Sequence, residues 1–120
     1  MEKTEVICQI FAYNRPDLLH SLLSSIDSNT RREDLNYLIR VDGVKSVSDE
    51  RMVKRTSEIA RHWAERSGLN VQIMECTENY GLKRSIVEQL DYLTGITNAF
   101  IVLEDDLVLH SSFFEYHLKM

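Results

Sequence analysis

Three consecutive acidic residues, Glu104, Asp105 and Asp106, follow the apolar run 99–103. In an extended strand, Glu104 and Asp106 point to one side, about 7 Å apart, and Asp105 points to the other. Two carboxylates at that separation repel each other by about 2 kcal/mol at an effective dielectric constant of about 20. A divalent cation would offset this repulsion, and oxygen-only ligands suit Mg²⁺ or Mn²⁺ shared with a substrate diphosphate. On spacing alone, a solvated acidic turn is the alternative interpretation.

Other charged residues stand at the ends of predicted strands or the starts of predicted helices. Asp42 ends the strand-like run 36–41, where an acid commonly meets the ribose or base of a nucleotide, although it also suits an Asp-Gly turn. Lys83 and Arg84 fall in a first helical turn, where positive charge opposes the helix dipole. A nearby anion would explain them, and so would two solvated surface cations. Arg15 also stands beside a helix start, where a nearby anion would explain its charge. The alternative is that its aliphatic stem covers the adjacent helix.

The elements that must position these residues alternate between strand and helix along the whole chain. Short apolar, β-branched runs predict strands, and apolar residues at helical spacing predict amphipathic helices between them. The predicted strands cover residues 5–13, 36–41, 71–76 and 99–103. The predicted helices begin at Pro16, before Met52, at Leu82 and at Ser112, where Ser112 and Glu115 fit a capping box. The first three helices show apolar stripes at residues 18, 19, 22, 23 and 26, at residues 52, 53, 59, 60, 63 and 64, and at residues 82, 86, 87, 90 and 93.

This alternation predicts an α/β fold with three layers, in which a mostly parallel sheet of about four strands carries helices on both faces. Right-handed crossovers favour the strand order 3-2-1-4. The winding direction then reverses between the first and fourth strands, so the loops after Tyr13 and Leu103 open a ligand-binding crevice. The fourth strand would be a bare apolar edge, and we therefore expect the domain to be truncated at its carboxyl end.

Composition limits the class of protein. The 120 residues match one ordinary domain, with 43% hydrophobic and 28% charged residues and a net charge of −5. The sequence lacks a run of basic residues interleaved with aromatic residues, so we do not expect a nucleic-acid partner. No apolar stretch approaches the roughly 20 residues of a transmembrane helix, and residues 1–5 do not resemble a signal peptide, so we expect a cytoplasmic protein. Cys8 and Cys76 are too far apart for a zinc or redox pair and are expected to be reduced core residues.

Four segments taken together resemble the amino-terminal half of glycosyltransferases with the GT-A fold. They are residues 6–16, 40–43, 78–82 and 101–107, followed by Phe113-Phe114. The similarity is to bacterial family-2-like enzymes and to the N-acetylglucosaminyltransferase I group, whose equivalent of the Asp-x-Asp motif reads Glu-Asp-Asp, as residues 104–106 do here.

The resemblance implies a nucleotide-sugar donor lying across the crevice. It implies that Mn²⁺ or Mg²⁺ bridges the diphosphate to Asp106, that Glu104 and Asp105 contact the ribose and the donor sugar, and that Asp42 addresses the base or ribose. The loop of Ala12, Tyr13, Asn14 and Arg15 would line the nucleotide, and the segment 79–84, with Gly81, Lys83 and Arg84, would close over it. In inverting members the catalytic base comes from a later segment, so we expect it beyond Met120.

We therefore expect residues 1–120 to form one nucleotide-diphospho-sugar-binding domain. It would be the donor-binding part of a metal-dependent glycosyltransferase that transfers a sugar to a glycan, lipid or protein acceptor, and it would be inactive alone. A non-catalytic nucleotide-sugar-binding module is the alternative. A receiver-like signalling domain that binds Mg²⁺ fits less well, because acids are missing after the first and third strands, where residues 13–14 and 76–77 stand. A nucleotidyltransferase-like domain would need a glycine-rich basic loop after the first strand.

Overall fold

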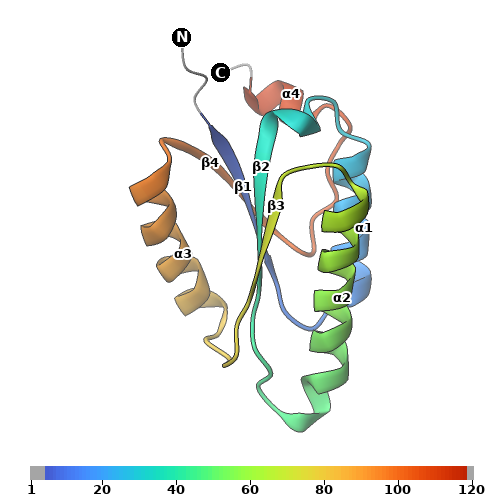
Figure 1. The fold of residues 1–120 in the computed structure, drawn as a ribbon, viewed down its shortest axis with the longest axis vertical. Coiled ribbons are helices and arrows are strands. Elements are labelled where there is room, and N and C mark those ends of the chain that lie inside the picture. The colour runs from blue at the N-terminus through green and yellow to red at the C-terminus, as the bar shows by residue number, and fades with distance from the viewer. Residues whose placement is uncertain (1–4, 119–120) are drawn as a thin grey trace.

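Four parallel strands form the centre of the computed structural model, which describes residues 5–118 (Figure 1). They are β1 (Val6–Ala12), β2 (Leu35–Val41), β3 (Val71–Glu75) and β4 (Ala99–Glu104), in the order β3-β2-β1-β4. The predicted strand order is confirmed, and all the pairings are parallel. Because Phe11 pairs with Glu104 and Ala12 with Val41, the carboxyl ends of β1, β2 and β4 lie level at one edge of the sheet.

Helices flank the sheet on both sides, as predicted. They are α1 (Pro16–Asp27), α2 (Glu50–Arg66), α3 (Leu82–Ile96) and α4 (Phe113–Leu118), with short 3-10 turns at η1 (Arg32–Asp34) and η2 (Val47–Asp49). In Figure 1, α3 stands alone on one side of the sheet, and α1 and α2 lie together on the other. The chain passes to the face of α3 after β3 and returns to the face of α1 and α2 after β4. The passage after β3 produces the reversal of winding between β1 and β4.

The main core lies between the sheet and α1, α2 and α4. Alternate residues of β1, namely Cys8, Ile10 and Ala12, point to this face and belong to one buried apolar cluster. The cluster also holds the leucine stripe of α1 and the aromatic residues Tyr37, Trp63 and Phe114. The centroid of the Tyr37 ring lies 5.3 Å from that of Trp63 and 6.3 Å from that of Phe114, both in edge-on arrangements. Burying one large apolar side chain contributes about 1.5–3 kcal/mol, so this face supplies most of the stability.

The opposite face, under α3, is mixed, because it buries polar side chains beside the apolar Ile7, Phe11 and Leu93. Gln9 of β1 and Arg40 of β2 are fully buried there, and Ser85 and Gln89 are among the residues that α3 buries. The predicted apolar stripe of α3 is wrong at Leu82 and Val87, which are 55% and 60% exposed; Leu18 of α1 and Met52 of α2 are also exposed. The stripe differs because the buried Arg40 guanidinium needs acceptors, and it takes one from Gln89 at 3.1 Å.

The predicted capping box of α4 does not form. The Ser112 hydroxyl pairs with His110 Nδ1 at 2.9 Å, and Glu115 accepts a hydrogen bond from Thr30 instead. The first turn of α4 is satisfied by Asn29, whose buried side chain accepts from the Phe114 amide at 3.0 Å. A long-range partner therefore replaces the local cap.

The cysteines are both free thiols. Cys8 is buried as predicted, and burial strongly raises the pKa of its thiol. Cys76 is only half-buried, so its assignment to the core is wrong. It stands at the carboxyl end of β3, where the chain leaves the sheet. Within residues 5–118, no helix combines the length and apolarity that crossing a bilayer requires.

Candidate functional site

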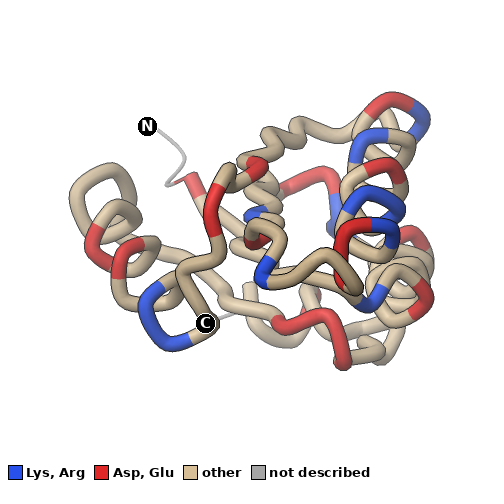
Figure 2. The backbone as a smooth tube through the Cα atoms, turned by 90° about the horizontal axis from the view of Figure 1, so that it is seen from below, with Lys and Arg blue, Asp and Glu red and all other residues tan. Residues whose placement is uncertain are grey.

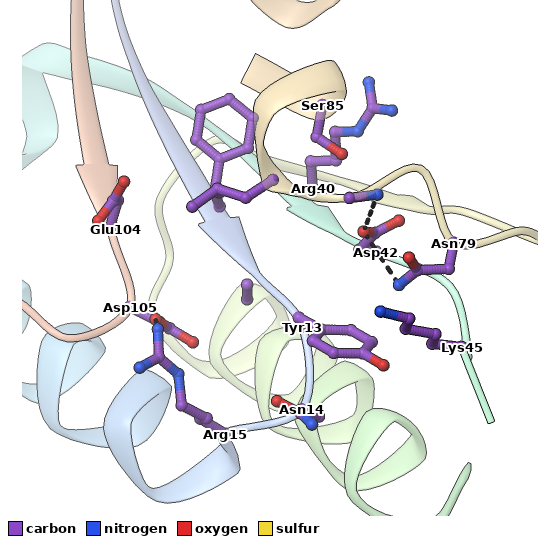
Figure 3. A pocket seen from close by; sticks show the side chains of 14 residues that line it. Tyr13, Asn14, Arg15, Arg40, Asp42, Lys45, Asn79, Ser85, Glu104 and Asp105 are labelled. Atoms are coloured by element: carbon purple, nitrogen blue, oxygen red, sulfur yellow. Dashed lines mark hydrogen bonds and ion pairs between the residues drawn. The ribbon is translucent and has the colours of Figure 1, made fainter. Parts of the chain in front are cut away.

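A cavity of about 440 Å³ opens at the carboxyl edge of the sheet, where the crevice was predicted (Figure 3). We call it the edge cavity. β1, β2 and β4 supply its floor, and the loop after β1, the loop before α3 and the first turn of α3 supply its walls. It is lined by Phe11, Ala12, Tyr13, Asn14, Arg15, Arg40, Asp42, Lys45, Asn79, Gly81, Leu82, Ser85, Glu104 and Asp105.

Most of the predicted site residues meet in this cavity. The four residues of the loop 12–15 line it, as do Asp42, Gly81, Glu104 and Asp105. Lys83, Arg84 and Asp106 do not line it. Arg84 forms an ion pair with Glu88 at 2.9 Å and lies over the Tyr80 ring, so it is a surface cation with local partners. Lys83 is exposed on the same helical turn.

The three acids do not follow the predicted extended alternation. β4 ends at Glu104, and the Leu107 amide donates to the Glu104 carbonyl at 3.2 Å, so the chain turns over residues 104–107. The turn leaves Asp106 exposed on the surface and buries Asp105. Glu104 and Asp105 therefore face the edge cavity together, in place of the predicted pair Glu104 and Asp106.

Arg15, in the loop after β1, forms an ion pair with Asp105, in the turn after β4. The Arg15 guanidinium donates to the Asp105 carboxylate at 2.5 Å, and the Asp105 side chain is only 4% exposed (Figure 3). Burial raises the pKa of Asp105 above its ordinary value, and the Arg15 charge opposes that rise. The pair ties the loop after β1 to the turn after β4, so it shapes the cavity as well as lining it.

Asp42 organises the wall of the cavity. One carboxylate oxygen accepts from the amides of Gly43 and Tyr80, each at 2.9 Å, and the other accepts from the Gly81 amide at 3.0 Å and the Asn79 side chain at 3.3 Å. Asp42 thus lines the cavity and also makes the Asp-Gly turn contact, while its contact with a base or ribose stays a prediction. Its oxygens are occupied by the chain's own donors, which fastens the loop 79–81 to the end of β2.

A second cluster fixes the loop after β1. Asp49 accepts from the Tyr13 hydroxyl at 2.5 Å and from the Asn14 side chain at 3.1 Å. These two hydrogen bonds lower the pKa of Asp49, while burial and the contact with Asp49 raise the pKa of Tyr13. Sequence reasoning missed Asp49 because it lies 35 or more residues from its partners and carries no motif of its own.

The hydrogen bond from Tyr13 gives a titration prediction. In Tyr13→Phe, the pKa of Asp49 should rise toward its ordinary value, because the first cause of its depression is removed. A depressed carboxylate pKa stabilises the fold above the ordinary pKa, and this contribution is lost as pH falls through the folded value. The variant should therefore lose less stability on acidification than the parent. Carboxyl NMR titration checks the shift, and an unchanged Asp49 titration would contradict the contact.

Arg40, Lys45 and Ser85 line the cavity but were not among the predicted binding residues, whereas Asn79, which also lines it, belongs to the segment 79–84 that was expected to close over the nucleotide. The signal for Arg40 was an arginine inside an otherwise apolar strand segment. Its guanidinium is 2% exposed and donates to Gln89 at 3.1 Å and to Glu88 at 3.2 Å. Nothing local marked Lys45 or Ser85, because only the packing of the loop after β2 and of α3 brings them to the edge.

The donor set for a metal is limited. Within residues 5–118, no group of three or more histidine, cysteine, aspartate or glutamate side chains is arranged to hold a metal ion. Acidic and basic residues are interspersed in the view onto the carboxyl edge in Figure 2. Any cation at this edge would therefore need further oxygens from a ligand, as Mg²⁺ commonly takes them from substrate phosphates.

Solved structures share this architecture. A mannosyltransferase, PcManGT from Pyrobaculum calidifontis, solved in complex with GDP-Man and Mn²⁺, is 18% identical over 88% of this chain, with a TM-score of 0.65. This chain therefore shares its fold with part of a solved glycosyltransferase. TarS from S. aureus is 13% identical over 96% of the chain, with a TM-score of 0.69.

The likeness is one of fold and not of close sequence. The chain spans 28% of the length of the mannosyltransferase and 19% of the length of TarS. No protein-family model and no curated protein sequence matches it.

Proposed function

We propose that the edge cavity binds a nucleoside-diphosphate sugar and that the chain is the donor-binding part of a glycosyltransferase. The observation that carries the proposal is the meeting of Glu104 and Asp105 with the loop 12–15 in one cavity, at the point where the sheet reverses its winding. Ligands of open α/β sheets bind at this point. The shared fold of a mannosyltransferase solved with GDP-Man supports the choice of ligand.

The described residues have distinct tasks in this proposal. Tyr13 and Asn14, held by Asp49, present a preformed wall to the nucleotide, so little entropy is lost in ordering that wall on binding. Lys45 lies beside Tyr13 at the cavity and adds positive charge next to the anionic ligand (Figure 3). Arg15 is engaged with Asp105 and keeps that carboxylate in place beside the donor sugar.

The oxygen-only donor set fits Mg²⁺ or Mn²⁺ that is shared with a diphosphate. Glu104 at the cavity wall and Asp106 on the exposed side of the same turn would hold the ion, because Asp105 is engaged with Arg15. The ion, when bound, supplies Lewis-acid stabilisation of the departing nucleoside diphosphate. The exposure of Asp106 leaves its carboxylate accessible to an ion that a ligand phosphate would also bind.

In this proposal, the acceptor site and the catalytic base are supplied by other parts of a longer protein. The expected position of the base, beyond Met120, lies outside the described residues. We propose that residues 1–120 form one donor-binding domain that binds without transferring sugar. A non-catalytic nucleotide-sugar-binding module would have the same cavity, and only sugar transfer by the longer protein separates the two.

Calorimetry tests the proposal. UDP or GDP should bind the chain more tightly with Mn²⁺ than without it, by about tenfold, since each tenfold step corresponds to about 1.4 kcal/mol. Asp106→Asn should remove the increment due to Mn²⁺. Asp91→Asn, which makes the same change on an exposed part of α3, serves as the control. The proposal fails if no nucleoside diphosphate binds, and the assignment of the metal fails if neither Mn²⁺ nor Asp106→Asn changes the affinity.

A further inference from the structure

We infer that the groove between α1 and α2 is a second ligand site, which binds a phosphate ester that carries a small apolar group. A cavity of about 320 Å³ opens there, and none of the residues that line it also lines the edge cavity. This volume lies at the lower end of the range found for small-molecule sites. The inference is independent of the proposed function, because neither the nucleotide nor the loops of the edge cavity take part in it.

The floor of the groove is apolar. α1 and α2 pack against each other on one face of the sheet, and the groove follows the line along which they meet (Figure 1). Leu23 of α1 and Trp63 of α2 lie in the floor and belong to the main core, and Ile59 of α2 packs against that core. Because the floor is the outer layer of a packed core, the groove keeps its shape without a ligand.

The walls of the groove are mainly basic. They consist of one residue of α1 and four of α2: His20, Arg55, Glu58, His62 and Arg66. The four positions on α2 recur every three or four residues, so their side chains share one face of the helix. Four of the five wall side chains can carry positive charge, although the chain as a whole has a net charge of −5. The groove therefore gathers cations on an acidic protein.

The carboxylate that contacts the floor is already engaged. One oxygen of Asp27 accepts from the Trp63 indole at 2.8 Å, and the other accepts from the Arg66 guanidinium at 3.0 Å. By contrast, Arg55, His20 and His62 take part in no ion pair within residues 5–118. The groove therefore offers donors that the chain itself leaves unpaired.

These donors suit a phosphate group on an apolar carrier. A guanidinium presents planar N–H groups that match two phosphate oxygens, and imidazole nitrogens add further donors. Arg55 supplies the guanidinium without a partner, next to the two histidines, and Ile59 and Leu23 supply apolar surface for the carrier. A free phosphate ester and a phospholipid head group share this chemistry.

The charge of the groove depends on its two histidines. Histidine side chains gain their charge between about pH 8 and pH 5. Two arginines against one glutamate give the lining side chains one net positive charge, and two protonated imidazoles raise it to three. The charged groups around the imidazoles on the two helices are Asp17, Asp27, Arg55, Glu58, Glu65 and Arg66. An anion should therefore bind more tightly as the pH falls.

NMR titration with phenyl phosphate and phenyl sulfate at pH 6 and pH 8 tests the inference. Phenyl sulfate keeps its charge over this range, whereas a phosphate ester loses part of its second charge near pH 6. We expect shifts of the amides of α1 and α2 around the groove, and phenyl sulfate about tenfold tighter at pH 6. Arg55→Gln should weaken both probes about fivefold, and the double variant His20→Gln with His62→Gln should remove the pH dependence. Inorganic phosphate should bind about threefold more weakly than phenyl phosphate, because it lacks the apolar part.

The controls separate a site from general surface charge. Lys54→Gln removes an exposed charge of α2 that does not line the groove, and it should change the affinity less than twofold. The substituted side chains are all exposed, and glutamine suits a helix, so the variants should keep the fold. Vesicles of anionic phospholipid distinguish the sources: binding that weakens in Arg55→Gln assigns the site to a head group, and phenyl phosphate binding without vesicle binding assigns it to a free ester.

Three results overturn the inference: no shift in α1 and α2, equal weakening by Lys54→Gln and Arg55→Gln, or phenyl sulfate binding that is the same at both pH values. Each of them leaves the proposed function standing, because the substituted residues lie outside the edge cavity.

Discussion

Replacing Gly43 by alanine should destabilise the fold by about 3 kcal/mol, because the new methyl group meets backbone and not a flexible side chain. A Cβ at this position would lie 2.3 Å from the carbonyl oxygen of Glu78 and 2.8 Å from its nitrogen. Atoms at such distances must separate, and the segment that has to move is the one fastened to Asp42 through Tyr80 and Gly81. The cost therefore combines overpacking with the loss of hydrogen bonds.

Denaturant unfolding of Gly43→Ala measures the expected loss. Gly95→Ala is the matched control, because no heavy atom lies within 4 Å of its Cβ position and the residue belongs to α3. Alanine in a helix is favoured over glycine, so the control should gain about 0.5–1 kcal/mol. Equal stability of Gly43→Ala and the parent would show that residues 78–81 do not pack on the end of β2. Nucleotide affinity should fall in Gly43→Ala, since the same segment forms a wall of the edge cavity.

The second large effect is expected from Arg15→Met. It removes the partner of Asp105 and leaves a carboxylate with a side chain only 4% exposed. Breaking a fully buried pair costs about 3–5 kcal/mol, and because the Arg15 side chain is 52% exposed we expect about 2 kcal/mol at neutral pH. The free energy of unfolding at pH 7 measures this cost.

The cost should depend on pH in a defined direction. The folded-state pKa of Asp105 is raised above its ordinary value of 3.8, so the protonated form stabilises the fold, and that contribution is lost as pH rises through the folded pKa. Without Arg15 the pKa should rise further. The difference between parent and Arg15→Met should accordingly be largest at neutral pH and should shrink toward pH 4.

A double variant separates charge from packing. Asp105→Asn combined with Arg15→Met leaves no unpaired charge at position 105, and it should recover part of the stability that Arg15→Met loses. A cost of Arg15→Met that is the same at pH 4 and pH 7, with no recovery in the double variant, would mean that Arg15 contributes only through its aliphatic stem.

These effects share one physical origin. The edge cavity is held open by contacts between loops that follow different strands: Arg15 with Asp105, Asp42 with the segment 79–81, and Tyr13 with Asp49. Each loop is short and anchored to a strand end at the same level of the sheet. The cavity is therefore a preorganised feature of the sheet edge and does not depend on one flexible segment closing over it.

Local patterns determined the architecture. Apolar runs and helical stripes predicted the four strands and four helices to within a few residues, and the handedness of crossovers predicted the order β3-β2-β1-β4. The same order brings the ends of β1, β2 and β4 together, so the sequence alone predicts that the loop 12–15, Asp42 and Glu104 lie at one edge. Strand period and crossover handedness act over short distances, and a sequence displays them directly.

Tertiary packing alone decided how the side chains at that edge are used. It turned the chain after Glu104, so that Asp105 and not Asp106 faces the cavity, and it engaged Asp42 with four donors. It also brought Ser85 and the buried Arg40 to the wall. These outcomes depend on contacts between residues tens of positions apart and on which donors and acceptors find partners once the faces are buried. Such contacts leave no periodic pattern in a single sequence.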